Sequence, residues 1–180
     1  MRKFCVLALC LVMLGVATEA KAGFIGNAIE YTYLFPDTST INEGPQVAVV
    51  GAGPEFLIFG AAPVDISDTQ IAIDWSPFTG SFFIDSSFNG PSFFDVFSTL
   101  DPITSVTING TTTFTSFDAS RISFTADRIS LNFSGLNINP DETLLVLDVG
   151  FAQVPEPATL SLIGVGLAGV IRARLRRKTN

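Results

Sequence analysis

The stretch that decides the fold is ITSVTINGTTTFTSF, residues 103–117. It is rich in β-branched and aromatic residues and carries no helix signal. Asn109 and Gly110 can adopt the positive φ values of a type I′ turn, with Val106 and Ile108 on one face of the incoming strand. The stretch therefore predicts a β-hairpin.

The sequence on both sides of this hairpin has the same character. A second hairpin is expected to join residues 81–88 to residues 92–98 through Asn89, Gly90 and Pro91, with the proline ending the pairing at the turn. Further strands are expected at residues 25–35, 46–50, 55–60, 69–75, 121–125, 129–134 and 143–151, with a turn or bulge at 126–128.

About nine short strands without intervening helices predict an all-β domain over residues 23–153. An antiparallel β-sandwich is the expected architecture, and a jelly roll is the alternative. The seventeen phenylalanines of the chain fit a core of alternating strand positions better than a stacking platform for sugars. Exposure of Trp75 and Tyr33 beside a groove would favour a carbohydrate site, whereas burial would count against it.

The N-terminal segment, residues 1–22, reads as a secretory signal peptide. A cationic start precedes the apolar run of residues 4–16, and Ala20 and Ala22 form a small-residue cleavage site. A buried N-terminal helix is the alternative. Cys5 and Cys10, the two cysteines of the chain, lie within this segment, so the processed chain is expected to have no disulfide and no cysteine nucleophile.

The charge of the central domain excludes several partners. Residues 23–154 contain fifteen acidic residues against two basic ones, Arg121 and Arg128, which gives a net charge of −13. A surface with so few cations cannot gain affinity by releasing counterions from a phosphate backbone. We therefore expect neither nucleic acid nor anionic lipid as a partner of this domain.

The residue types needed for most catalytic sites are missing. The chain has no histidine, which excludes a Ser-His-Asp triad, and residues 23–154 have no lysine for a phosphate-binding loop. The sequence indicates a protein that is not an enzyme and needs no cofactor. A glycoside hydrolase with two catalytic carboxylates stays open as a third alternative. Asp65, Asp68 and Asp74 are a hypothetical calcium site, because hard cations take carboxylate oxygens.

The C-terminal segment, residues 154–180, combines three features. Pro155, Glu156 and Pro157 hold an acidic residue in a helix-free segment. The fourteen uncharged residues 158–171 would span about 21 Å as a helix, which is short for a membrane core of about 30 Å but within reach of snorkelling cations. A stop-transfer cluster comes next, formed by Arg172, Arg174, Arg176, Arg177 and Lys178. These features predict a transmembrane helix with the acidic domain outside the cytoplasm; a buried core helix with a basic tip is the alternative.

This tail resembles the PEP-CTERM sorting signal of Gram-negative bacteria, on the basis of residues 154–180 and the signal peptide; the central domain is not covered. The resemblance implies that an exosortase in the inner membrane recognises Pro155, Glu156 and Pro157 and that the protein reaches the cell surface or an exopolysaccharide matrix. We therefore expect an exported protein with a structural or adhesive role. A carbohydrate- or calcium-binding module and a permanently anchored envelope protein are the alternatives.

Overall fold

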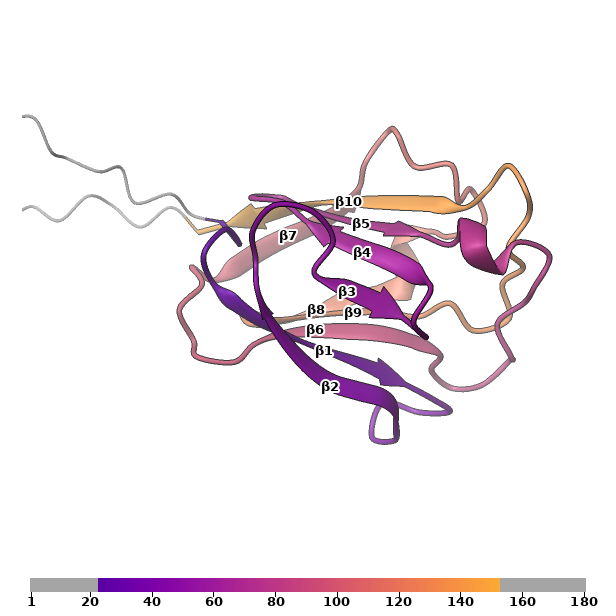
Figure 1. The fold of residues 1–180 in the computed structure, drawn as a ribbon, viewed down its shortest axis with the longest axis horizontal. Coiled ribbons are helices and arrows are strands. Elements are labelled where there is room, and N and C mark those ends of the chain that lie inside the picture. Colours follow the sequence, from indigo (N-terminus) through magenta and orange to yellow (C-terminus); the bar gives the residue numbers. More distant parts are fainter. Residues whose placement is uncertain (1–22, 153–180) are drawn as a thin grey trace, which may run out of the picture. The chain divides into compact units, whose positions relative to one another are not determined.

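The computed structural model describes residues 23–152, and residues Ala22–Gln153 form one compact unit. Two antiparallel sheets of five strands make up this unit (Figure 1). The first sheet has the order β2 (Ile41–Val49), β1 (Ala28–Leu34), β6 (Gly90–Asp95), β9 (Arg128–Leu131) and β8 (Ile122–Phe124). The second has the order β3 (Phe56–Ile58), β4 (Ala62–Ile66), β5 (Gln70–Asp74), β10 (Leu144–Phe151) and β7 (Ile103–Ile108).

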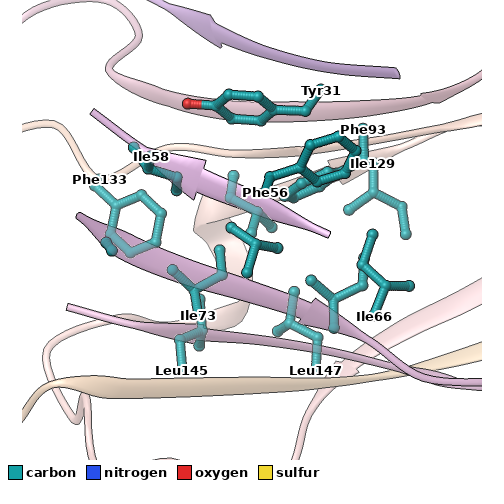
Figure 2. Packing of buried hydrophobic residues seen from close by; sticks show 14 of the residues in the cluster. Tyr31, Phe56, Ile58, Ile66, Ile73, Phe93, Ile129, Phe133, Leu145 and Leu147 are labelled. Atoms are coloured by element: carbon teal, nitrogen blue, oxygen red, sulfur yellow. The ribbon is translucent and has the colours of Figure 1, made fainter. Parts of the chain in front are cut away.

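A single hydrophobic core lies between the two sheets, the packing typical of a β-sandwich. Tyr31 and Phe93 of the first sheet lie on one side of the core, and Ile73 and Leu145 of the second sheet lie on the other (Figure 2). Alternating side chains of β5 and β10 point into this core because successive residues of a strand face opposite sides of its sheet. The prediction of an all-β, antiparallel fold is confirmed.

Two short 3-10 helices interrupt the strands, η1 (Ser76–Phe78) and η2 (Ala119–Arg121). Most of the expected strands are present, and the expected turn between residues 121–125 and 129–134 joins β8 to β9 through a hydrogen bond from the Thr125 N–H to the Arg128 carbonyl. Strand β4 is not among the strands that the sequence pattern predicts.

The hairpin predicted at residues 103–117 is wrong. Strand β7 forms as expected but pairs with β10, and neither Asn109 nor Gly110 has a positive φ. The side-chain amide of Asn109 donates to Asp148 instead, and its Oδ1 accepts from the Thr111 N–H. The returning segment is therefore not a strand, and it packs Phe114 and Phe117 into the core.

The hairpin predicted at residues 81–98 is wrong as well. Its second arm is β6, which begins at Gly90 and pairs with β1 and β9, and Pro91 lies opposite Tyr33 inside the sheet. Its first arm forms no strand beyond an isolated bridge between Phe82 and Asn137. Residues 81–89 form an irregular loop at one end of the sheets.

The two ends of the sheets differ in what they carry. Residues 23 and 152 lie at one end, where the Phe24 and Phe151 rings meet edge to face with centroids 5.0 Å apart. Strand β10 runs to this end from the opposite end of the sheets. At that opposite end the Trp75 N–H donates to the Thr143 carbonyl. We call these the terminal end and the loop end. Eight residues of β10 separate them by about 26 Å.

Candidate functional site: an aromatic pocket at the loop end

A pocket of about 260 Å³ opens at the loop end. It collects side chains from the end of β1, the start of β2, the β3–β4 turn, the end of β5, η1, the 81–89 loop and the segment between β9 and β10. Seven of the lining residues are aromatic: Tyr33, Phe35, Phe59, Trp75, Phe78, Phe82 and Phe83. The other five are Asn42, Ser81, Ile84, Asn89 and Ile138. No lining residue carries a charge.

The floor of the pocket is formed by buried aromatic side chains. Trp75 and Tyr33 are 1% and 2% exposed. The indole of Trp75 packs edge to face against Phe83 and Phe133, with ring centroids 4.9 and 5.0 Å apart. Such aromatic contacts fix ring orientation as well as burying area. The floor is therefore preformed rather than adaptable.

Tyr33 and Asn89 of the floor are linked by a hydrogen bond. The Tyr33 hydroxyl donates to Oδ1 of Asn89 at 2.7 Å, and Nδ2 of Asn89 donates to the Ile84 carbonyl at 2.9 Å. Burial raises the pKa of Tyr33, and the negative charge of Glu43 raises it further. Within residues 23–152, the indole N–H of Trp75 is the only buried side-chain polar atom without a hydrogen-bond partner.

The rim of the pocket is exposed and apolar. Phe82 and Ile84 of the 81–89 loop are 67% and 57% exposed, and Phe59 is 45% exposed. Phe82, Phe83 and Ile84 are consecutive in the sequence, so an extended segment cannot bury all three on one face. This run of three apolar residues is the sequence signal by which the rim could have been found.

A strained turn places Phe59 at the rim. Phe59 and Gly60 have φ values of 51° and 69°, and the Ala61 N–H donates to the Ile58 carbonyl, as in a type I′ turn. Positive φ is rare for a bulky residue and is a sign of strain that the surrounding structure must hold. The ring of Phe59 lies 4.6 Å from that of Tyr33, measured between centroids.

The residues of the calcium hypothesis do not form a metal site. Asp65 is exposed on β4, the Asp68 carbonyl accepts from the Phe24 N–H, and Oδ1 of Asp74 accepts from the Ser76 N–H. In the part of the chain that the structure describes, no three His, Cys, Asp or Glu side chains are grouped so that they could hold a metal ion.

Trp75 and Tyr33 are brought together at the pocket, as a carbohydrate site would need, but both are buried. This burial counts against a flat stacking platform built on these two residues.

The remaining predicted site residues lie outside residues 23–152. They are Ala20 and Ala22 of the signal cleavage site, the motif Pro155, Glu156 and Pro157, and the cluster Arg172, Arg174, Arg176, Arg177 and Lys178. The expected transmembrane segment, residues 158–171, also lies outside them. Between residues 23 and 152, no helix is both long and apolar enough to cross a membrane.

The fold and the pocket define a class: an all-β protein of two antiparallel sheets with an aromatic pocket at the end remote from residues 23 and 152. At its C-terminal end the chain carries a PEP-CTERM protein-sorting motif, because the family model of this motif matches residues 153–178. This match confirms the resemblance of the tail, while the domain of residues 23–152 is assigned to no family. No curated protein and no solved structure matches the chain. The motif supports an exported protein that is sorted at the membrane by an exosortase.

Proposed function

We propose that this protein is a cell-surface or extracellular-matrix protein with a structural or adhesive role, and that its β-domain acts by binding rather than by catalysis. The observation that carries the proposal is the aromatic pocket, which opens at the end of the domain remote from residues 23 and 152. A site in this position stays accessible when the chain is attached through its tail.

The chemistry of the pocket favours binding over catalysis. Ser81 and Tyr33 provide its hydroxyl groups, and no carboxylate or amine lines it to serve as general acid or base. A hydroxyl nucleophile needs such a base within hydrogen-bond reach. A carboxylate-only glycoside hydrolase needs two acids flanking its substrate, and none of the lining residues is acidic.

The sorting motif supports the route to the surface. On this proposal the chain is held in the inner membrane by residues 158–171 with the β-domain outside the cytoplasm, and an exosortase then cuts near Glu156. The released domain would associate with extracellular polysaccharide. Its net charge of −13, from fifteen acidic and two basic residues, keeps it soluble in a hydrated matrix.

Two exposed phenylalanines provide a matched test of the adhesive role. Phe82 is 67% exposed at the pocket rim, and Phe97 is 68% exposed outside the pocket. Cells of the producing bacterium that carry Phe82→Ser should attach less to surfaces and retain less of the protein in their matrix than cells with Phe97→Ser.

The amount of each variant is measured on intact cells by surface proteolysis. Equal attachment of the two variants, at equal surface abundance, would contradict a binding role for the pocket. Recovery of the parent chain from the cytoplasm with Met1 intact would contradict export itself.

A further inference from the structure

We infer that the pocket binds a methylated ammonium cation, such as the trimethylammonium group of choline, over the faces of its aromatic side chains. This inference deepens the proposed binding role and rests on it. Three features of the pocket carry it: the lining, the hydrogen bonding of the floor, and the charge of the surroundings.

The lining offers π-systems in place of ions. Seven aromatic side chains surround about 260 Å³, which is ample room for a compact group, since a cavity of about 150 Å³ accepts benzene. Aromatic rings carry negative charge on their faces and attract cations placed over them. Quaternary ammonium groups suit such pockets because they are weakly hydrated and apolar on the outside.

The hydrogen bonds of the floor argue against a sugar. Tyr33, Asn89 and Ile84 satisfy one another through bonds of 2.7 and 2.9 Å. The indole N–H of Trp75 is the unpartnered polar group of the floor, and as a donor it cannot accept the hydrogen of a ligand hydroxyl. Burying a hydroxyl without a partner costs free energy. A trimethylammonium group has no N–H or O–H hydrogen to donate, so burying it there leaves no hydrogen-bond donor unpaired.

The charge around the pocket selects a cation over a neutral or anionic group. The domain has fifteen acidic residues and two arginines, and both arginines are engaged elsewhere. Arg121 donates to the carbonyls of Asn132 and Ser134, and Arg128 lies 4.4 Å above the Phe94 ring. Such a field raises the local concentration of cations and repels anions.

Glu43 places one of these charges close to the pocket. Its Oε2 accepts hydrogen bonds from the Phe59 N–H at 2.9 Å and the Tyr31 hydroxyl at 2.6 Å. The same carboxylate acts on the pKa of Tyr33, whose ring is part of the floor. Glu43 therefore both positions the rim residue Phe59 and supplies negative charge beside the pocket.

The test uses Trp75, the one tryptophan of the chain, as a built-in fluorescent reporter of the pocket. The full chain is placed in nanodiscs of phosphatidylethanolamine and phosphatidylglycerol, which contain no choline. Choline and 3,3-dimethylbutan-1-ol are titrated in parallel experiments. The alcohol has the same shape as choline without the charge. We expect saturable binding of choline and at least tenfold weaker binding of the alcohol. Equal affinities, or no saturable response to choline, would overturn the inference.

Variants and salt separate cation recognition from simple apolar binding. Phe82→Ser should weaken choline binding roughly tenfold, and Phe97→Ser should leave it unchanged. Glu43→Gln should weaken choline but not the alcohol, and raising the NaCl concentration should do the same, because both reduce electrostatic attraction. An equal loss in Phe82→Ser and Phe97→Ser, or insensitivity of choline binding to salt, would overturn the inference.

A phosphocholine titration identifies the source of the group. Binding as tight as that of choline indicates a phosphocholine-bearing headgroup, and weaker binding indicates a free methylated amine; both outcomes support cation recognition. Failure of choline to bind a chain that still mediates attachment would overturn this inference alone. Binding of choline to a chain that is not exported would overturn the proposed surface role alone.

Discussion

The carboxylate of Glu43 on β2 accepts a hydrogen bond from the backbone N–H of Phe59 at 2.9 Å and so joins the edges of the two sheets. The Tyr31 hydroxyl donates to the same Oε2 from the neighbouring strand β1. One side chain therefore ties the strained β3–β4 turn to the first sheet, and the shape of the pocket rim depends on it.

The strain at Phe59 predicts how substitutions there affect stability. Phe59→Val should lower the free energy of unfolding by about 1–3 kcal/mol, because a β-branched residue tolerates positive φ poorly. Phe59→Asn should have a smaller effect, because asparagine adopts this conformation readily and this gain offsets the lost contact with Tyr33. Chemical denaturation of the two variants beside the parent measures the difference. A larger loss in Phe59→Asn than in Phe59→Val would show that the turn is not strained.

The close packing around Gly90 predicts that an added side chain there would destabilise the first sheet. A Cβ at this position would lie 2.0 Å from the Leu131 carbonyl oxygen, a backbone atom that cannot move aside easily. Gly90→Ala should therefore destabilise the domain by about 2–3 kcal/mol. Gly110→Ala is the matched control, since nothing lies within 4 Å of its added Cβ. Thermal unfolding that shows equal effects in both variants would contradict the close approach of β6 and β9.

The two tyrosines of the chain predict its behaviour at alkaline pH. Burial raises the pKa of Tyr31, as does its hydrogen bond to Glu43, and burial raises the pKa of Tyr33. Their contribution to stability is fully present below the ordinary tyrosine pKa of about 10. It declines as the pH rises above that value, because the unfolded chain releases protons that the folded chain keeps.

Absorbance at 295 nm should therefore report tyrosinate only as the domain unfolds, in one step that coincides with the loss of β-structure by circular dichroism. Formation of tyrosinate at pH 10 in a domain that is still folded would contradict the burial of the two hydroxyl groups.

The sorting motif predicts separate roles for Glu156 and the basic cluster. Glu156→Ala should leave the β-domain folded while the uncut protein accumulates in the inner membrane. Neutral replacements at Arg172, Arg174, Arg176, Arg177 and Lys178 should instead impair the orientation or retention of the tail before cutting. Fractionation with mass spectrometry of both chain ends distinguishes the two. Normal processing and export of Glu156→Ala in the native host would favour a simple C-terminal anchor.

Local sequence pattern predicts most strands but not their partners. The alternation of Ile71 and Ile73 identifies β5 by itself, because one face of a strand is buried. The pairing of Ile108 with Leu147 cannot be seen in the local sequence. The side chain of Asn109 donates a hydrogen bond to Asp148 instead of supporting a hairpin turn. The Asn-Gly signal therefore marks the position of a bend but does not determine whether the next segment is a strand.

The pocket is only partly predictable for a similar reason. Trp75 and Tyr33 can be identified from the sequence as residues of a possible site, and they lie together on its floor. Their burial and the positive φ of Phe59 depend on how seven segments meet at the loop end, which no single segment encodes. The charge of the domain, in contrast, is a direct consequence of composition.

The path of β10 determines how the domain would respond to mechanical load. This strand leads out of the domain at residue 152 and is paired on both sides, with β5 and with β7. A pull between a ligand in the pocket and residue 152 would run along the strand, so that its hydrogen bonds to both neighbours bear the force together in shear. Peeling them apart one at a time would need a sideways pull. A tether attached at this point would therefore load the sheet in its mechanically strongest direction.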